Sequence, residues 1–245
     1  MHAFPVFVRA LLAATLAFAG FSASAATIAF AGYTWEVREG SGGPGPNRWS
    51  ANNVWVDDAG LHLRISHEDG QWRCAEVTMT RTLGFGTYVF QFTGRPDLFD
   101  RNSVLGLFNY PTPEIGPDGT NEIDIEFAQW GDASNPNRLN WTVYPPALGP
   151  APTHDEFPLA LSGDATTHRF HWTSRNVRYT SQHGYQDSGS KNLIATWNDA
   201  PSSPKRAIPQ HPLPVHINLW LFKGRPPTDG QSVEVVIRSF KYTPD

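Results

Sequence analysis

Short runs of residues that favour β-strands, separated by turn-forming clusters, are the feature that most limits how this 245-residue chain can fold. The runs are rich in Val, Ile, Thr, Phe, Tyr and Trp, whereas Gly, Pro, Asn and Asp gather between them. They lie at residues 51–56, 61–66, 74–82, 87–92, 103–110, 122–130, 138–144, 168–173, 177–182, 215–222 and 232–242. Because long amphipathic helices and strand–helix alternation are both missing from the pattern, we predict an all-β fold, a two-sheet β-jelly-roll sandwich.

The N-terminus has the layout of a secretory signal peptide, predicted at residues 1–25. Arg9 precedes a nearly apolar stretch at 10–21, and small residues ending at Ala25 form a cleavage site. The stretch is too short to span a bilayer, and it lacks the periodicity and caps of a buried helix, which is the alternative. We expect a secreted protein, extracellular or periplasmic, with a single catalytic domain at 26–245 and no membrane span.

Charge and cysteine content exclude several classes of protein. The chain has 19 Lys and Arg against 23 Asp and Glu, without a basic cluster that would follow a phosphate backbone, so nucleic acid is not an expected partner. Cys74 is the single cysteine, which rules out an internal disulfide.

His168 and His171 would point to opposite faces of a strand and do not form a metal pair. We expect a monomer that needs no cofactor and no metal.

One heptapeptide, residues 121–127, alternates strictly between polar and apolar side chains. On a strand, Glu122, Asp124 and Glu126 would share one face, and the three apolar residues that alternate with them would pack into the sandwich on the other. Neighbouring carboxylates raise one another's pKa, and acidic residues are poor strand formers. The arrangement therefore points to chemistry, although a solvated acidic strand face explains the pattern as well. A calcium site is a weaker alternative, because calcium needs more oxygen ligands.

The spacing of the two glutamates suits the hydrolysis of a glycosidic bond. Their Cα atoms would lie about 13 Å apart on a strand, and each side chain can lean inward by roughly 4 Å. The carboxyl groups would then approach to about 5 Å, the separation expected of a retaining glycosidase. One glutamate would attack the anomeric carbon and the other would protonate the leaving oxygen. Asp124 between them would hydrogen-bond its neighbour and hold one proton in the cluster.

Further motifs occur along the chain in a fixed order. They are Trp-Ser-Ala-Asn-Asn-Val at 49–54, Cys-Ala-Glu at 74–76, Gly-Phe-Gly-Thr-Tyr at 84–88, Glu-Ile-Asp-Ile-Glu-Phe at 122–127 and Asn-Leu-Trp at 218–220. Together they resemble glycoside hydrolase family 16, most closely its lichenase-like bacterial β-glucanases, over about residues 35–242. The resemblance implies a concanavalin A-like jelly roll. The acidic motif has no extra residue before its last Glu. In this respect it is similar to the motif of lichenases and xyloglucan-active members.

The resemblance also implies roles for individual residues. Glu122 would be the nucleophile, Glu126 the acid/base and Asp124 the assisting acid. The positions that match substrate-binding residues of the family are Glu76, Tyr144, Asn218 and Trp220. Trp130 shares strand parity with Glu126 and would extend the cleft. A surface ion pair is the alternative for Glu76, and a place in the core is the alternative for either tryptophan.

Several positions depart from the family pattern. Thr120 and Asn121 stand where lichenases have Trp-Asp, and Thr78 replaces a substrate-binding Arg. Arg238 stands where many members have a calcium-binding Asp, which supports the expectation that no metal is needed. Asn47 stands at the family's disulfide partner of Cys74, so we expect a reduced, buried thiol. These changes leave the chemistry intact, but they do not favour one particular glucan.

The sequence thus predicts a retaining, endo-acting glycoside hydrolase that cleaves a β-linked polysaccharide, with β-1,3-1,4- or β-1,3-glucan as the favoured substrate. Two alternatives remain. A transglycosylase of the same family would form the same glycosyl-enzyme and pass the sugar to another sugar hydroxyl. A non-catalytic carbohydrate-binding jelly roll would explain the fold and the aromatic residues, but not three carboxylates on one face.

Overall fold

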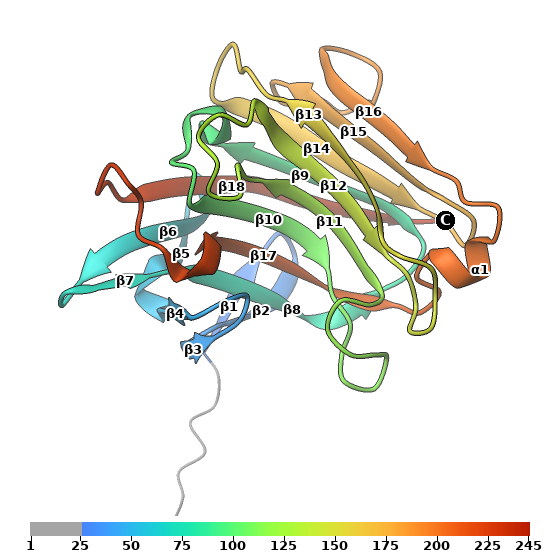
Figure 1. The fold of residues 1–245 in the computed structure, drawn as a ribbon, viewed down its shortest axis with the longest axis horizontal. Coiled ribbons are helices and arrows are strands. Elements are labelled where there is room, and N and C mark those ends of the chain that lie inside the picture. The colour runs from blue at the N-terminus through green and yellow to red at the C-terminus, as the bar shows by residue number, and fades with distance from the viewer. Residues whose placement is uncertain (1–25) are drawn as a thin grey trace, which may run out of the picture.

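Two large antiparallel sheets pack against each other in the computed structural model, which describes residues 26–245 (Figure 1). The predicted signal peptide lies outside the described residues. Eight strands form the first sheet, in the spatial order β1 (Thr27–Phe30), β2 (Tyr33–Val37), β8 (Ala75–Leu83), β17 (Leu213–Leu221), β10 (Ser103–Asn109), β11 (Glu122–Phe127), β12 (Asn137–Tyr144) and β13 (Thr153–Pro158). The two-sheet jelly-roll prediction is confirmed.

The second sheet also has eight strands, and two short strands form a hairpin outside both large sheets. Its order is β16 (Leu193–Asp199), β15 (Val177–His183), β14 (Ala165–Trp172), β9 (Gly86–Thr93), β18 (Val233–Pro244), β6 (Gly60–Glu68) and β5 (Val54–Asp57), with β7 (Gln71–Arg73) paired to β6. A separate hairpin joins β3 (Gly40–Gly42) to β4 (Asn47–Trp49). The described helices are α1 (Pro204–Ala207) and the 3-10 turns Ala51–Asn53, Pro96–Leu98 and Phe222–Gly224.

Alternating side chains build the core between the sheets. On β9, Tyr88, Phe90 and Phe92 are fully buried, whereas the residues between them face outward. On β11 the apolar residues also face inward, and the ring of Phe127 meets that of Phe92 edge-to-face at 5.4 Å. Since β11 buries this apolar face in the core, its acidic face must point away from the second sheet.

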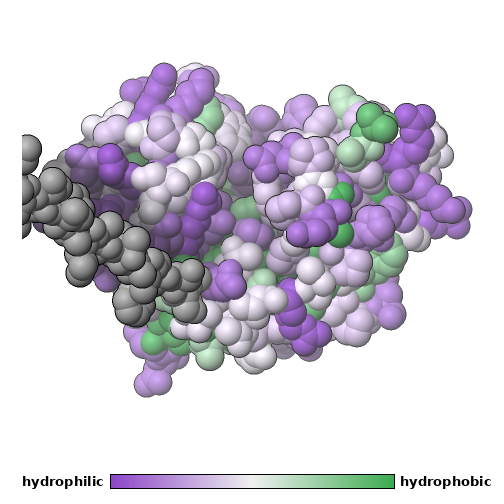
Figure 2. All heavy atoms as spheres, turned by 90° about the horizontal axis from the view of Figure 1, so that it is seen from below, coloured by the Kyte–Doolittle hydropathy of each residue, from purple (hydrophilic) through white to green (hydrophobic). Residues whose placement is uncertain are grey.

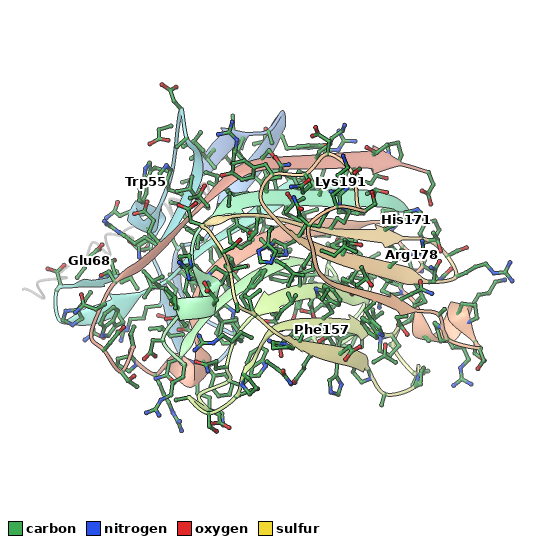
Figure 3. The ribbon with its side chains drawn as sticks, turned by 90° about the horizontal axis from the view of Figure 1, so that it is seen from above. Trp55, Glu68, Phe157, His171, Arg178 and Lys191 are labelled. Carbon is green, nitrogen blue, oxygen red and sulfur yellow. The ribbon has the colours of Figure 1, made fainter. Side chains whose placement is uncertain are left out.

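The two histidines of β14 face opposite ways, as predicted. His168 is fully buried, its Nδ1 lies 2.7 Å from Ser181 Oγ, and burial lowers its pKa to about 3. His171 lies on the outer face of the second sheet, where its Nε2 contacts Asp245 Oδ1 at 2.9 Å (Figure 3). The pair therefore cannot share a metal ion. Within residues 26–245, no helix combines the length and the apolar character needed to cross a membrane.

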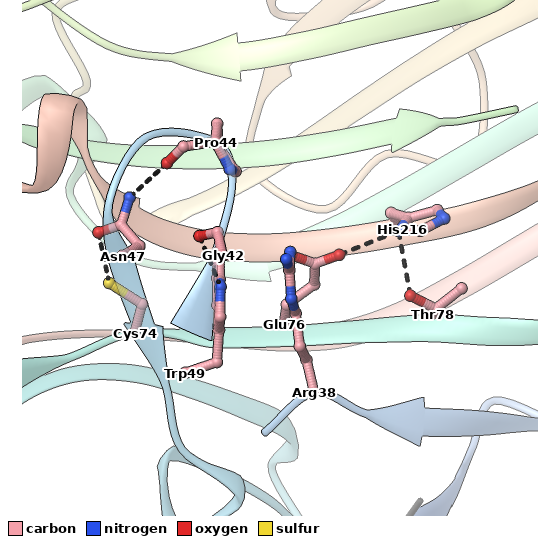
Figure 4. A network of polar contacts seen from close by, with 9 residues as sticks. All are labelled: Arg38, Gly42, Pro44, Asn47, Trp49, Cys74, Glu76, Thr78 and His216. Carbon is pink, nitrogen blue, oxygen red and sulfur yellow. Dashed lines mark hydrogen bonds and ion pairs between the residues drawn. The ribbon is translucent and has the colours of Figure 1, made fainter. Parts of the chain in front are cut away.

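Cys74 is a buried free thiol, in agreement with the sequence prediction. Its Sγ donates to Asn47 Oδ1 at 3.3 Å, so the position implied as its former disulfide partner does lie beside it (Figure 4). Burial raises the pKa of the thiol to about 12, which makes it a poor nucleophile. The Nδ2 of Asn47 donates to the carbonyls of Pro44 and Leu221, so the amide joins β4 to β17.

Asn47→Cys is expected to form a disulfide with Cys74. The bridge would close a loop of 27 residues, which restricts the unfolded chain by about 3.5 kcal/mol. The lost hydrogen bonds of Asn47 offset about 2 kcal/mol of this. The oxidised variant should therefore melt a few degrees above the native protein, and the reduced variant should melt below it. Thermal melts with and without dithiothreitol test this, with Asn47→Ser as the control; a melting temperature that does not respond to the reductant would contradict it.

Candidate active site

The acidic face of β11 forms part of the floor of a cleft of about 1070 Å³ on the outer face of the first sheet. Seen from below, the molecule is hollowed, and hydrophilic side chains gather there (Figure 2). Lining residues come from six adjacent strands, from Tyr144 on β12 to Glu36 on β2. At about 4.8 Å per strand, this set spans about 24 Å. An open cleft of that length can hold several units of a polymer.

Strand register aligns the cleft residues in two rows that run across the sheet. The first row consists of Asn140, Glu126, Gly106, Asn218 and Glu76. The second row consists of Thr142, Asp124, Phe108, His216 and Thr78. The acids of β11 thus face the same side as the predicted binding residues of β8 and β17, although these strands are far apart in sequence.

Gly106 makes room for the side-chain amide of Asn218 in the floor of the cleft. A Cβ at this position would lie 2.5 Å from Asn218 Oδ1, closer than real Cβ atoms approach, and 3.3 Å from the ring of Phe108, which is a tight contact. Glycine is therefore favoured here by its neighbours rather than by its backbone angles. A larger residue would require the Asn218 side chain to move.

The three carboxyl groups of β11 interact with one another; Asp124 is buried, and Glu122 and Glu126 are partly buried. Burial raises the pKa of all three, and the charge of Glu126 raises that of Glu122 further. Asp124, only 3% exposed, is shifted most clearly, because burial acts together with both glutamates. Hydrogen bonding with Asp124 partly offsets the shift of Glu122. At neutral pH the cluster therefore holds at least one proton, as a site with both a general acid and a nucleophile requires.

Two buried oxygens in the cleft have no hydrogen-bond partner within the described part of the chain. They are Asp124 Oδ1 and Asn218 Oδ1. Leaving a buried polar atom unpaired costs about 1–3 kcal/mol, so such atoms usually have a functional reason. A hydroxyl-rich ligand would supply the missing donors. These atoms mark the part of the cleft where a ligand would gain most from hydrogen bonding.

The predicted aromatic residues lie at the sides of the acidic cluster. Tyr144 is opposite Glu122 in the register of β12 and β11. The strand predicted to run to Trp130 ends at Phe127, and Trp130 has a left-handed backbone with φ of 54°, so the predicted strand parity of Trp130 with Glu126 is wrong. Trp130 still lines the cleft, and its Nε1 donates to Asn140 Oδ1 at 3.0 Å. Trp220 also lines the cleft, with its ring centroid 6.4 Å from that of Trp130.

Glu76 lies within a polar network at the far side of the cleft (Figure 4). Its Oε2 accepts from Arg38 Nη1 at 2.7 Å, and its Oε1 lies 3.1 Å from His216 Nδ1. The same Nδ1 lies 3.0 Å from Thr78 Oγ1. Burial alone would raise the pKa of Glu76, but the contacts with His216 and Arg38 outweigh it and lower the pKa. Glu76 is thus a buried ion-pair partner inside the cleft, not a residue of the open surface.

The sequence reasoning missed Arg38 and His216. His216 has the same strand parity as Asn218 and Trp220, which the family resemblance had identified, so alternation along this strand also pointed to it. Arg38 directly follows β2, and its guanidinium lies 4.3 Å from the centroid of the Trp49 ring. Nothing in the local sequence around Arg38 indicated this position, because β2 and β8 become neighbours only in the folded sheet.

Asp124→Asn is expected to stabilise the protein at alkaline pH. The folded-state pKa of Asp124 is raised above its unfolded value, so its stability contribution is complete below pH 4 and is lost as pH rises through the folded pKa. The amide removes this loss. We expect a higher free energy of unfolding than that of the native protein at pH 8 and little difference at pH 4. Urea unfolding at both values tests this. Asp58→Asn, in a surface turn, is the control, and a gain that does not depend on pH would contradict the prediction.

The fold is that of solved β-glucanase structures. A Bacillus licheniformis β-glucanase aligns with a TM-score of 0.63 at 23% identity, over 86% of this chain and 92% of that one. A Mycobacterium tuberculosis protein described as an immunostimulatory antigen and pseudo β-1,3-glucanase, Rv0315, aligns with a TM-score of 0.63 at 19% identity, over 86% and 91%. Other solved structures with this fold are described as family 16 glycoside hydrolases. The implied resemblance to family 16 is therefore confirmed at the level of the fold.

Sequence comparison gives one curated relative that agrees with this fold. A rice protein, xyloglucan endotransglycosylase/hydrolase protein 8 of Oryza sativa subsp. japonica, is 28% identical over 175 residues. The match covers 67% of this chain and 55% of the rice protein, so the chain spans about half the length of that relative. No family model matches the chain.

Proposed function

We propose that this protein is a retaining, endo-acting glycoside hydrolase that cleaves a β-linked polysaccharide. The observation that carries the proposal is the row of three carboxyl groups on alternate positions of β11, the central one buried and the outer two partly buried, in the floor of a cleft. Their raised pKa values supply both a protonated acid and an ionised base near neutral pH. The cleft crosses six strands, which suits cutting within a chain rather than at its end.

The proposed reaction has two displacements. An ionised oxygen of Glu122 attacks the anomeric carbon, the bond from that carbon to the leaving oxygen breaks, and Glu126 gives its proton to that oxygen. Glu126, now a carboxylate, then takes a proton from a water, whose oxygen attacks the same carbon and releases Glu122. Asp124 is a positioning acid that holds a proton between the two. The pKa of Glu126 falls when the charge of Glu122 is lost to the ester, and rises when Glu122 is freed.

A β-1,3-1,4- or β-1,3-glucan is the proposed substrate class. The support is the likeness to β-glucanase structures and the open cleft with aromatic rings at its sides, which can stack on sugar rings. Thr120 and Asn121 offer no aromatic platform directly before the acidic strand, so selectivity has to come from elsewhere in the cleft.

The test is release of reducing ends from barley β-glucan, laminarin, xyloglucan, agarose and carrageenan by the purified protein. A fall in viscosity that precedes most of the sugar release would identify endo action. Hydrolysis of one of the two glucans supports the proposal in full. Absence of new reducing ends from all five substrates over a broad pH range would overturn it.

Transglycosylation is the second candidate, and the name of the rice relative favours it. In that reaction a sugar hydroxyl instead of water would take the glycosyl group from Glu122. Xyloglucan mixed with a fluorescent xyloglucan oligosaccharide separates the two cases: a transglycosylase moves the label into long chains without net release of reducing ends. Binding without any bond cleavage would instead support a non-catalytic jelly roll, for which the mycobacterial pseudo-glucanase is a structural parallel.

We further propose that residues 1–25 are a signal peptide and that residues 26–245 act as a single secreted domain and as a monomer. The support is the apolar stretch of the N-terminus and, within residues 26–245, a hydrophobic core that includes residues of both sheets. Mass spectrometry of the exported protein would give an N-terminus at Ala26 if this is correct.

A further inference from the structure

His216 has one ring nitrogen committed to the protein and one that is not. Nδ1 lies 3.1 Å from Glu76 Oε1 and 3.0 Å from Thr78 Oγ1, whereas Nε2 has no partner among residues 26–245. The ring lines the cleft and stacks on Phe108, with centroids 5.1 Å apart. Tyr110 meets the ring at its edge, 5.6 Å between centroids. Packing therefore fixes the orientation of the ring, and its free nitrogen is the one available to a ligand.

The contacts of Nδ1 also determine where the ring carries its proton. An ionised carboxylate only accepts hydrogen bonds, so the approach of Glu76 Oε1 requires a proton on Nδ1. The neutral ring is then the Nδ1–H tautomer, and Nε2 carries a lone pair. Arg38 keeps Glu76 ionised through a 2.7 Å bond to its other oxygen. The guanidinium of Arg38 is itself held against the Trp49 ring. It also lies close to Gly42, where an added Cβ would be 3.0 Å from Arg38 Nη2.

Glu76, by contrast, has both oxygens occupied by protein donors. Its side chain is 7% exposed; one partner, Arg38, directly follows β2, and the other, His216, lies on β17. A sugar hydroxyl would have to compete with a charged guanidinium or with an imidazole for either oxygen. Both residues line the cleft, but the oxygens of Glu76 are engaged by the protein, whereas His216 has a free ring nitrogen to offer to a ligand.

We propose that His216 is the side chain that this part of the cleft presents to the polysaccharide, with Nε2 accepting a hydrogen bond from a sugar hydroxyl. Glu76 and Arg38 are positioning residues that set its tautomer. This inference rests on the proposed function for the identity of the ligand. His216 lies two strands, about 10 Å, from Asp124 in the same row, so it contacts a sugar unit away from the bond that is cut. It should therefore influence substrate binding more than the chemical step.

Two substitutions of His216 separate the effect of a hydrogen bond from Nε2 to the sugar from the effect of the ring's packing. In His216→Asn, the amide NH₂ can still donate to Glu76, but the acceptor in the cleft is lost. In His216→Gln, the longer side chain carries an amide oxygen near the former position of Nε2. Binding of the five polysaccharides is measured by affinity electrophoresis, and KM and kcat are measured on any of them that is cut. His171→Asn on the opposite sheet is the matched control (Figure 3).

For His216→Asn we expect binding about tenfold weaker and KM about tenfold higher, with kcat within about twofold, the effect of one lost hydrogen bond. His216→Gln should stay within about threefold of the native protein. Equal losses in both variants would mean that only the ring's packing matters, and would overturn the inference. Native binding by His216→Asn would overturn it as well, and so would failure of the unaltered protein to bind any of the five polysaccharides. Binding without hydrolysis would support the inference while refuting the hydrolase.

The tautomer can be measured without any ligand. Nitrogen-15 NMR of the ring should show an unprotonated Nε2 and a protonated Nδ1 in the free protein. Glu76→Gln, whose amide can either accept or donate, should shift His216 toward a mixture of both tautomers and raise KM. A free protein in which Nε2 carries the proton would overturn the inference independently of any sugar.

Discussion

Glu122→Ala is expected to abolish hydrolysis of every polysaccharide and of activated aryl glycosides alike, with kcat lower on the order of 10⁵-fold or more. The reason is that no covalent intermediate can form without this carboxylate, however good the leaving group. The vacated space can admit azide, which would attack the anomeric carbon from the face that Glu122 normally uses. From a β-glycoside, the rescued product should be an α-glycosyl azide.

Proton NMR of the first product identifies its anomeric configuration, and circular dichroism checks that the variant is folded. Glu68→Ala, on the second sheet and remote from the cleft, is the matched control and should keep native activity (Figure 3). The unaltered enzyme should release a β-anomer first. An α-anomer as first product would indicate inversion, and the role of Glu122 as nucleophile would have to be abandoned.

Glu126→Ala should give a different profile, one that depends on the leaving group. Hydrolysis of polysaccharide needs a proton on the departing sugar oxygen, so kcat should fall about 10³-fold. An aryl glycoside with an acidic phenol leaves without that proton, so the glycosyl-enzyme should still form and then accumulate, because no base activates water. Azide should speed its breakdown and give a β-glycosyl azide.

A burst of phenol followed by a slow steady state is the kinetic signature, and intact-protein mass spectrometry would detect the glycosylated enzyme. The alkaline limb of the pH profile should disappear in this variant, since that limb reports loss of the proton from the acid. Equal losses on activated and unactivated substrates would be inconsistent with an acid/base role for Glu126.

Local sequence patterns predicted the strands that carry strong β-formers, and they did so less well at the margins of the sheets. The runs on β9 and β11 alternate or are strongly apolar, so the core-facing residues could be identified directly. The missed β13, Thr153–Pro158, contains His, Asp and Glu, and it pairs only at the edge of the first sheet. Its conformation depends on hydrogen bonds from β12, which its own residues do not indicate.

The candidate active site also contains residues that local sequence patterns predicted and residues that they did not. Three carboxylates at alternate positions are a local signal, so the acidic cluster could be predicted from β11 alone. The contact of Arg38 with Glu76 joins residues 38 positions apart on neighbouring strands, and it depends on the order of strands in the sheet. The partners of Glu76 therefore could not be predicted: the residue does line the cleft, and two protein donors hold its oxygens.

The glycine in the cleft floor bears on how this protein can change over evolutionary time. Every single-nucleotide change at codon 106 that yields another amino acid adds at least a Cβ, which would collide with Asn218. Substitution there would first require the Asn218 side chain to move, and with it a buried oxygen that has no hydrogen-bond partner among residues 26–245. Drift toward new substrates should therefore proceed along the walls and the loops, while a change at position 106 should be accompanied by a change in the position or identity of residue 218.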